Sequence, residues 1–287
     1  MAPIKVRIIL PGGGVKGAFQ LGFLSQVLGS GMYEVDAVYG CSIGAILAPM
    51  VSVGGLARLK AIFDGIRSVT DVVQRRTAFG MPYPDWKIVQ GLSSFLQMGA
   101  YQRVKLVDTV FADLSADELV LARERCHVVA YDILNNQERW FTGGQLVDGV
   151  RCSSALWLAV PPIAFEGSLF SDGGATEVFP VTYILDHDLS QAFDGQYLFV
   201  DCDARTPYTN DAPTDGLTLM SCLQWGATTR LAEYELAKLV AQLGPSLKVV
   251  RPDANLLSGA LDVDPGRMQA TFNAGSAKGA EFLRAAL

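Results

Sequence analysis

The stretch VDAVYGCSIGAILAPMVSV, residues 35–53, decides the fold. Its apolar run over residues 35–39 predicts a buried strand, and residues 43–53 predict the helix that follows directly. The turn between them has the G-x-S-x-G form of a nucleophile elbow, which presents a serine hydroxyl at a helix N-terminus. Glycines and a serine also occur together in ordinary turns. The interpretation of this motif as a nucleophile elbow therefore depends on the neighbouring motifs. The predicted elbow comprises Gly40, Cys41, Ser42, Ile43 and Gly44.

The same order of elements occurs immediately upstream. Residues 6–10 predict another buried strand and residues 17–28 predict its helix, with a glycine-rich turn between them. Repeated strand–turn–helix units imply a parallel sheet covered by helices. Apolar runs on both sides of residues 135–137 (Asn-Asn-Gln) predict a hairpin. We therefore predict one α/β domain over residues 1–287, a three-layer α/β/α arrangement with a mostly parallel central sheet.

Helical spacing predicts two long segments outside this first part of the chain. Residues 104–125 read as helical, with Ser115 and Glu118 placed as a capping box. Residues 215–243 predict a long amphipathic helix with a break near Gly226, because glycine weakens a helix interior. The chain shows no repeats and no convincing linker, which agrees with a single domain.

Composition narrows the classes of function. The chain has 287 residues, 50% of them hydrophobic and 18% charged, with a formal net charge of −6. Since nucleic-acid binding relies on clustered Lys and Arg and no basic run occurs, we expect no nucleic-acid partner. No stretch approaches the ~18 unbroken apolar residues of a membrane-spanning helix. The start also lacks the pattern of a signal peptide.

The expected location follows from these absences and from the cysteines. The five cysteines are odd in number and lack metal-ligand spacing, which indicates reduced thiols. We expect a cytoplasmic protein, with peripheral membrane contact and export without a signal peptide left open. Nothing resembles a calcium site, so we expect neither a metal nor a cofactor. The oligomeric state is left open.

The glycine-rich turn after the first predicted strand allows two functional interpretations. It satisfies G-x-G-x-x-G, the dinucleotide-binding fingerprint, but that site needs an acidic residue at the end of the second strand. Glu34 and Asp36 stand at the beginning of that strand instead. The other interpretation is an oxyanion hole, in which successive backbone N–H groups stabilise the negative oxygen of a tetrahedral intermediate. The candidate residues are Gly12, Gly13, Gly14, Val15, Lys16 and Gly17.

A serine nucleophile needs a proton acceptor, usually a histidine oriented by a carboxylate. His127 lies in an apolar run typical of the core, and His187 lies in a polar stretch typical of a surface loop. The order Ser42, Asp172, His187 matches an α/β-hydrolase triad, although that fold places more strands before its elbow. Asp172 alone is the other candidate, because the residues around it can hold a carboxylate at a strand-end turn. This aspartate turn comprises Asp172, Gly173 and Gly174.

Together these motifs resemble the patatin-like phospholipase family. Three blocks occur in the family's order: G-G-G-x-K-G at 12–17, G-x-S-x-G at 40–44 and D-G-G at 172–174. A fourth stretch, residues 151–162, resembles the family's Ser-Ala helix that leads to a proline. The chain departs from the pattern between the aspartate turn and the next proline, where the family often has asparagine and this chain has Glu177 and Val178.

The resemblance implies a Ser42–Asp172 dyad without histidine, an oxyanion hole in the glycine turn and hydrolysis of acyl esters in lipids. Asp172 would accept the Ser42 proton as the hydroxyl attacks an ester carbonyl. The backbone N–H groups of Gly13 and Gly14, helped by Val15, would hold the oxyanion. A free aspartate is a poor base at neutral pH, so we expect burial to raise its pKa.

Two further expectations concern substrate and surface. The implied partner is a lipid or phospholipid substrate. Residues 71–102, apolar and broken by Gly and Pro, are a predicted lid or lipid-contacting segment, with core or dimer contact as the alternative. The competing functions are a His187-dependent esterase or thioesterase acting on soluble acyl esters, and a non-enzymatic or nucleotide-binding protein.

Overall fold

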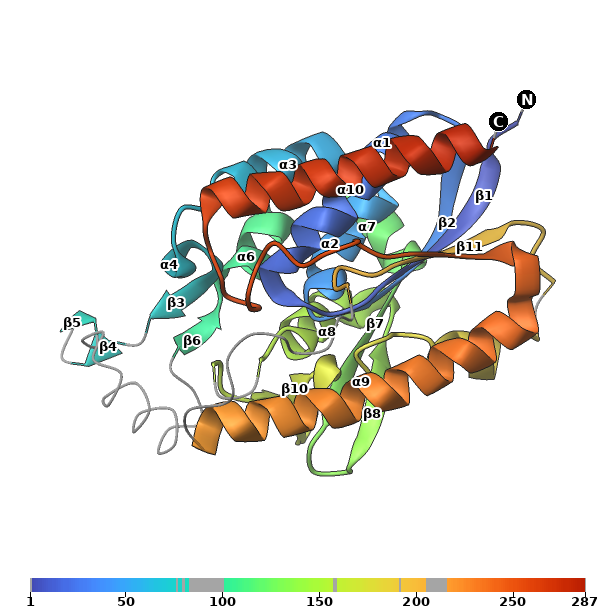
Figure 1. The fold of residues 1–287 in the computed structure, drawn as a ribbon. Coiled ribbons are helices and arrows are strands. Elements are labelled where there is room, and N and C mark those ends of the chain that lie inside the picture. Colours follow the sequence, from blue (N-terminus) through green and yellow to red (C-terminus); the bar gives the residue numbers. More distant parts are fainter. Residues whose placement is uncertain are drawn as a thin grey trace.

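The computed structural model describes residues 2–75, 77–78, 81–82, 101–156, 159–190, 192–204 and 216–286. At its centre lies an eight-stranded sheet in the order β12-β11-β1-β2-β7-β10-β9, with β8 also paired to β7 (Figure 1). The strands of this sheet are β1 (Ile4–Leu10), β2 (Tyr33–Cys41), β7 (Cys126–Asp132), β8 (Gln137–Phe141), β9 (Ile163–Phe165), β10 (Ser168–Asp172), β11 (Gln196–Val200) and β12 (Leu247–Val250).

Most of the sheet is parallel, as predicted. Strands β12, β11, β1, β2 and β7 run in one direction, and β8, β10 and β9 add antiparallel pairs. The parallel strands read as nearly continuous apolar runs because both faces of such a sheet are covered. In β2, for example, the last five residues are all buried.

Helices cover both faces of the sheet (Figure 1). The longest, α9, crosses the face opposite to the one that carries α1 and α10. The α-helices are α1 (Ala18–Gly29), α2 (Ile43–Ser52), α3 (Leu56–Asp64), α4 (Val69–Val72), α6 (Lys105–Ala112), α7 (Ala116–Arg125), α8 (Leu146–Ser153), α9 (Gly216–Leu243) and α10 (Pro265–Ala286). The three-layer α/β/α prediction is confirmed.

Each face of the sheet has its own core. The larger one includes Phe19 and Phe23 of α1, which pack beneath α10. The smaller one gathers Tyr39 of β2 and Phe199 of β11 with Leu236 of α9. Burying an aromatic or aliphatic side chain of this size contributes roughly 1.5–3 kcal/mol. The glycine turn follows β1 and Ser42 follows β2, so both lie at the carboxyl ends of these parallel strands.

The predicted hairpin and the predicted capping box are both present. β7 and β8 pair antiparallel, with Asp132 opposite Gln137. Ser115 accepts a hydrogen bond from the Glu118 amide, and the Glu118 carboxylate accepts one from the Ser115 amide. These are short-range features, in which side chains and backbone only a few residues apart satisfy one another.

Two of the predicted helices have different limits in the structure. Residues 104–125 form two helices, α6 and α7, because the Ser115 cap starts a new helix instead of continuing the old one. The predicted break near Gly226 is wrong, since α9 runs uninterrupted from Gly216 to Leu243. The ~1 kcal/mol helix penalty of a single glycine is smaller than the gain from packing a long apolar stripe.

The predicted lid or lipid-contacting segment, residues 71–102, lies largely outside the described residues. Its described ends form small two-stranded pairs. β3 (Val73–Arg75) pairs with β6 (Tyr101–Val104), and β4 (Thr77–Ala78) pairs with β5 (Met81–Pro82). Among the described helices, none combines the length and the apolar character needed to cross a membrane.

Candidate active site

Ser42 occupies a strained turn between β2 and α2. Its backbone angles are φ 54° and ψ −118°, in a region that residues other than glycine rarely adopt. Such strain is what a nucleophile elbow requires, because it lifts the serine hydroxyl away from both the strand and the helix. Gly44 makes the turn possible, since a Cβ there would lie 1.9 Å from the carbonyl oxygen of Leu10 on the neighbouring strand.

Strand β7 brings Ser42 and Asp172 together. β2 pairs with β7 so that Cys41 lies opposite Val129, and β10 pairs with β7 so that Asp172 lies opposite Ala130. The two strands therefore end at neighbouring positions along β7, and the residue that follows Cys41 meets the last residue of β10. The Ser42 hydroxyl donates a hydrogen bond of 2.6 Å to Asp172 Oδ2.

The Asp172 carboxyl group is buried, and its burial changes its pKa. It is 3% exposed, and its second oxygen accepts a hydrogen bond of 2.8 Å from the Gly174 amide. Burial raises the pKa of Asp172 to about 6, with hydrogen bonds from Ser42 and Gly174 acting in the opposite direction. The group is therefore ionised at neutral pH yet binds a proton more readily than an exposed aspartate does, as expected from the sequence.

The glycine turn lies beside Ser42, since a Cβ on Gly12 would be 3.0 Å from the Ser42 Cβ. The Gly12 amide donates to the Val178 carbonyl at 3.1 Å, and the Val15 amide donates to the Ala260 carbonyl at 2.9 Å. Within the described part of the chain, the amides of Gly13 and Gly14 have no hydrogen-bond partner. These two N–H groups therefore remain free to donate hydrogen bonds to a ligand. The expected help from Val15 would first require its bond to Ala260 to break.

Gly14 is required by its conformation as well as by space. Its φ is +63°, and a Cβ built there would lie 2.1 Å from the Ala260 carbonyl oxygen. This carbonyl also accepts the Val15 amide, so the loop before α10 packs directly on the glycine turn. This close approach of the two backbones explains why position 14 is a glycine.

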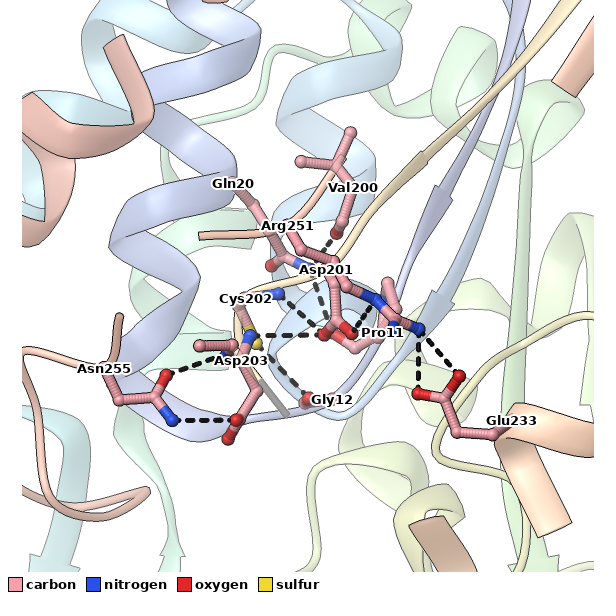
Figure 2. Close-up of polar contacts among 11 residues, drawn as sticks. Pro11, Gly12, Gln20, Val200, Asp201, Cys202, Asp203, Glu233, Arg251 and Asn255 are labelled. Atoms are coloured by element: carbon pink, nitrogen blue, oxygen red, sulfur yellow. Dashed lines mark hydrogen bonds and ion pairs between the residues drawn. The ribbon is translucent and has the colours of Figure 1, made fainter. Parts of the chain in front are cut away.

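Residues at the end of β11 also hold the glycine turn in place (Figure 2). The Lys16 ammonium group pairs with the Asp203 carboxylate at 2.6 Å, and both side chains are largely buried. Asn255 Nδ2 also donates to Asp203, at 2.8 Å. The Cys202 thiol donates to the Gly12 carbonyl at 3.3 Å. Lys16 is thus part of the structure that holds the glycine turn in place.

The same strand end connects to α9. Asp201 is fully buried, and its carboxylate accepts the amides of Cys202 and Asp203 (Figure 2). Arg251 forms ion pairs with both Asp201, at 3.4 Å, and Glu233 of α9, at 2.8 Å. A continuous set of charged contacts therefore runs from the end of β11 to α9.

Two supports of the dyad were not identified from the sequence. The buried Ser153 hydroxyl, at the end of α8, accepts a hydrogen bond of 2.9 Å from the Ser42 amide. The Ala155 carbonyl accepts a hydrogen bond of 3.0 Å from the Asp172 amide. Helix α8 ends at Ser153, and this leaves the Ala155 carbonyl available to Asp172. The Ser-Ala stretch marked the region without indicating these contacts.

Neither histidine belongs to this arrangement. The His187 ring lies against Tyr183, with 4.7 Å between ring centroids, in a short π-helix (Ile184–Asp188). The His127 ring stacks on Tyr39 at 5.1 Å. No hydrogen bond joins either imidazole to Ser42 or Asp172 among the described residues. The described residues also contain no group of three or more His, Cys, Asp or Glu side chains that could hold a metal ion.

The chain is similar to a known protein family and to several known proteins. The family model described as Patatin-like phospholipase matches residues 8–185. The neuropathy target esterase sws of Drosophila melanogaster is 26% identical over 195 residues, which cover 66% of this chain and 12% of that protein. The same esterase of Drosophila willistoni is 25% identical over 183 residues, covering 61% of this chain and 11% of that protein. The chain thus spans only a small part of these relatives.

Two solved structures can be aligned over almost the whole chain. VipD from Legionella pneumophila has a TM-score of 0.46 and 13% identity, covering 98% of this chain and 67% of that one. ExoU, in complex with SpcU from the type III secretion system of Pseudomonas aeruginosa, has a TM-score of 0.36 and 17% identity, covering 99% and 59%. The family model spans more than half of the chain and includes the glycine turn, Ser42 and Asp172. The chain therefore belongs to the patatin-like phospholipase family of lipid ester hydrolases.

Proposed function

We propose that this chain is a serine lipid acyl hydrolase of the phospholipase A or lysophospholipase type, with Ser42 as nucleophile and Asp172 as base. The observation that carries the proposal is the 2.6 Å hydrogen bond from the Ser42 hydroxyl to a buried carboxylate, with no histidine in contact with either group in the described residues. A Ser–Asp pair needs only these two side chains and an oxyanion hole to perform acyl transfer.

The first step forms the acyl-enzyme. Ser42 Oγ attacks the ester carbonyl carbon while Asp172 Oδ2 accepts the hydroxyl proton. The carbonyl oxygen becomes an oxyanion, and the free amides of Gly13 and Gly14 donate hydrogen bonds to it. The carbon–oxygen bond to the alcohol then breaks, and the alcohol leaves with the proton held by Asp172.

The second step releases the fatty acid. Asp172 accepts a proton from a water molecule, whose oxygen attacks the acyl carbon of the Ser42 ester. The same two amides stabilise the second oxyanion, and the proton returns to Ser42 Oγ as the acyl bond breaks. Both steps use one base at one position, so the hydrogen bond between Ser42 and Asp172 forms again after each turnover.

The substrate class follows from chemistry and from the family. An alkoxide leaves more easily than an amine anion, which favours esters over peptides for a base as weak as Asp172. The relatives are esterases by name, and the matched family is one of phospholipases. We propose a lipid or phospholipid substrate met by peripheral contact with a membrane, in the cytoplasm.

A fluorophosphonate probe tests the nucleophile, and hydrolysis of a phospholipid and of a p-nitrophenyl ester tests the substrate class. We expect Ser42→Ala to abolish labelling and hydrolysis, and His187→Ala to leave both unchanged, because His187 contacts Tyr183 and not the dyad. Equal labelling of wild type and Ser42→Ala would refute the nucleophile. Loss of activity in a folded His187→Ala variant would instead support the histidine-dependent esterase.

A further inference from the structure

Glu177 lies five residues after Asp172, at one of the positions where the chain departs from the family pattern, and its side chain is completely buried. One carboxyl oxygen accepts the amides of Val181 and Thr182, at 2.8 and 2.7 Å. The other accepts the Thr182 hydroxyl at 2.6 Å. A single side chain therefore closes the loop that follows the aspartate turn.

The backbone held in this way touches both parts of the active site. The Glu177 amide donates to the Gly173 carbonyl at 2.8 Å, inside the aspartate turn. The next carbonyl, that of Val178, accepts the Gly12 amide at 3.1 Å, at the start of the glycine turn. Displacement of this backbone would change the position of Asp172 relative to the oxyanion donors.

The surroundings of Glu177 indicate a shared proton. The Thr182 hydroxyl lies 3.1 Å from a carboxyl oxygen of Glu138 in β8 and 2.6 Å from a carboxyl oxygen of Glu177, so the two acids are near neighbours. Thr182 has one hydroxyl proton and cannot donate to both acids at once. Two neighbouring buried carboxylates repel each other, and a proton on one of them removes that repulsion. The arrangement therefore favours one proton on the Glu177–Glu138 pair.

No basic side chain neutralises this pair. Among the described residues, no Lys or Arg forms an ion pair with Glu138 or Glu177. The facing helix α9 contributes another acid, Glu235, which has a buried oxygen without a hydrogen-bond partner, and one base, Lys238. The pKa of Glu177 is raised well above its usual range, mainly by burial and to a smaller extent by Glu138. Burial and the charge of Glu138 raise the pKa of Glu235 to about 7, opposed by Lys238.

We propose that Glu177 is a positioning residue for ester hydrolysis: as a buried carboxylic acid it holds residues 177–182 and thereby keeps Asp172 and the glycine turn in register. This inference rests on the proposed function. Ionisation of the pair would place two unpaired negative charges in contact, near Asp172 and the buried Cys41 thiol. The loop would then loosen, so activity should fall on the alkaline side of its optimum.

The test compares Glu177→Gln with Glu177→Ala, using the rate of fluorophosphonate labelling at Ser42 and the kcat and KM for a p-nitrophenyl ester across pH. Glutamine keeps the oxygen that accepts both amides and replaces the shared proton with an amide hydrogen. We expect Glu177→Gln to retain activity within about twofold and to lose the alkaline decline. We expect Glu177→Ala to lose ~10- to 100-fold in labelling rate and kcat with little change in KM.

Two further variants keep the test decisive. Thr182→Val replaces the Thr182 hydroxyl with a methyl group and keeps the size of the side chain. It therefore tests the same hydrogen bonds around Glu177 if Glu177→Ala does not fold. We expect a several-fold fall in kcat. Glu281→Gln, at an exposed position of α10, is the matched control and should behave as wild type. A folded Glu177→Ala protein labelled at the wild-type rate, or an alkaline decline that persists in Glu177→Gln, would overturn the inference. Absence of labelling in wild type would instead count against the proposed function.

Discussion

The glycine turn and the aspartate turn face the same serine, but they are held in different ways. The glycine turn depends on distant parts of the chain: Lys16 pairs with Asp203, 187 residues away, and the Ala260 carbonyl fills the space beside Gly14. The aspartate turn is held mostly by its own neighbours. Asp172 accepts the Gly174 amide, and Glu177 closes the loop through Val181 and Thr182.

This difference separates the groups that are proposed to take part in the reaction from the contacts that only hold those groups in place. In the proposed mechanism the aspartate turn carries the base itself, so a change there removes a chemical step. In the same mechanism the glycine turn supplies backbone amides whose position depends on remote contacts, and the loss of activity should grow with the distance that those amides move. The expected effects of substitution therefore decrease from the base, through the amides, to the distant supports.

The largest effect should come from Asp172→Asn. Asparagine fills the same space but cannot accept the Ser42 proton, so we expect a loss of about 10²- to 10⁴-fold in kcat with the fold intact. Steady-state hydrolysis together with circular dichroism measures both quantities. Asp253→Asn, at a position whose side chain is 87% exposed, serves as the control. Near-normal turnover in folded Asp172→Asn would remove Asp172 from the mechanism.

Gly14→Ala should have the next largest effect. A methyl group there would meet the Ala260 carbonyl and would need a positive φ, so the two free amides must shift. We expect kcat/KM to fall by ~10²–10³, comparable to the loss of an oxyanion donor. Gly29→Ala is the matched control, because a Cβ there meets no atom within 4 Å. If both variants kept full activity, the glycine turn would not be the oxyanion hole.

The pH dependence of kcat/KM should show an acid limb at about 6, the pKa to which burial raises Asp172. Below it the base is protonated, and the rate should fall about tenfold per pH unit. The free energy of unfolding should depend on pH in the opposite sense. The native state binds this proton more tightly than the unfolded chain does. The contribution of Asp172 to stability is therefore present at low pH and is lost as the pH rises to about 6. A profile that stayed flat through this range would contradict the assignment.

The smallest effect should come from the pair of Lys16 and Asp203. Each single change, Lys16→Met or Asp203→Asn, removes the ion pair and leaves one largely buried charge without the opposite charge that it contacts now, and we expect labelling of Ser42 to slow about tenfold. The double variant should recover part of that loss, because no unpaired charge is left. The exposed pair of Lys278 and Asp253 provides the control cycle. Purely additive losses would show that the ion pair does not hold the glycine turn.

The parts of the fold that were predictable depend on short-range chemistry. Strand–turn–helix alternation indicated the parallel sheet, and Ser115 with Glu118 marked the start of α7. The limits of helices were less predictable, because α8 ends where the Ala155 carbonyl is needed by Asp172, and α9 continues past Gly226 where packing outweighs propensity. Both outcomes depend on partners that lie far away along the chain.

The sequence by itself determined the chemical types at the site: a serine between two glycines, an aspartate before two more, and a glycine-rich turn after the first strand. These are local requirements of tight turns, and they appear directly as residue patterns. Only the tertiary structure decided which groups meet. Pairing along β7 joins Ser42 to Asp172, and the bonds of Gly12 and Val15 leave the amides of Gly13 and Gly14 free. These contacts join residues that lie between 42 positions apart (Ala130 and Asp172) and 245 positions apart (Val15 and Ala260), and their proximity is created by burial of the sheet and its helices.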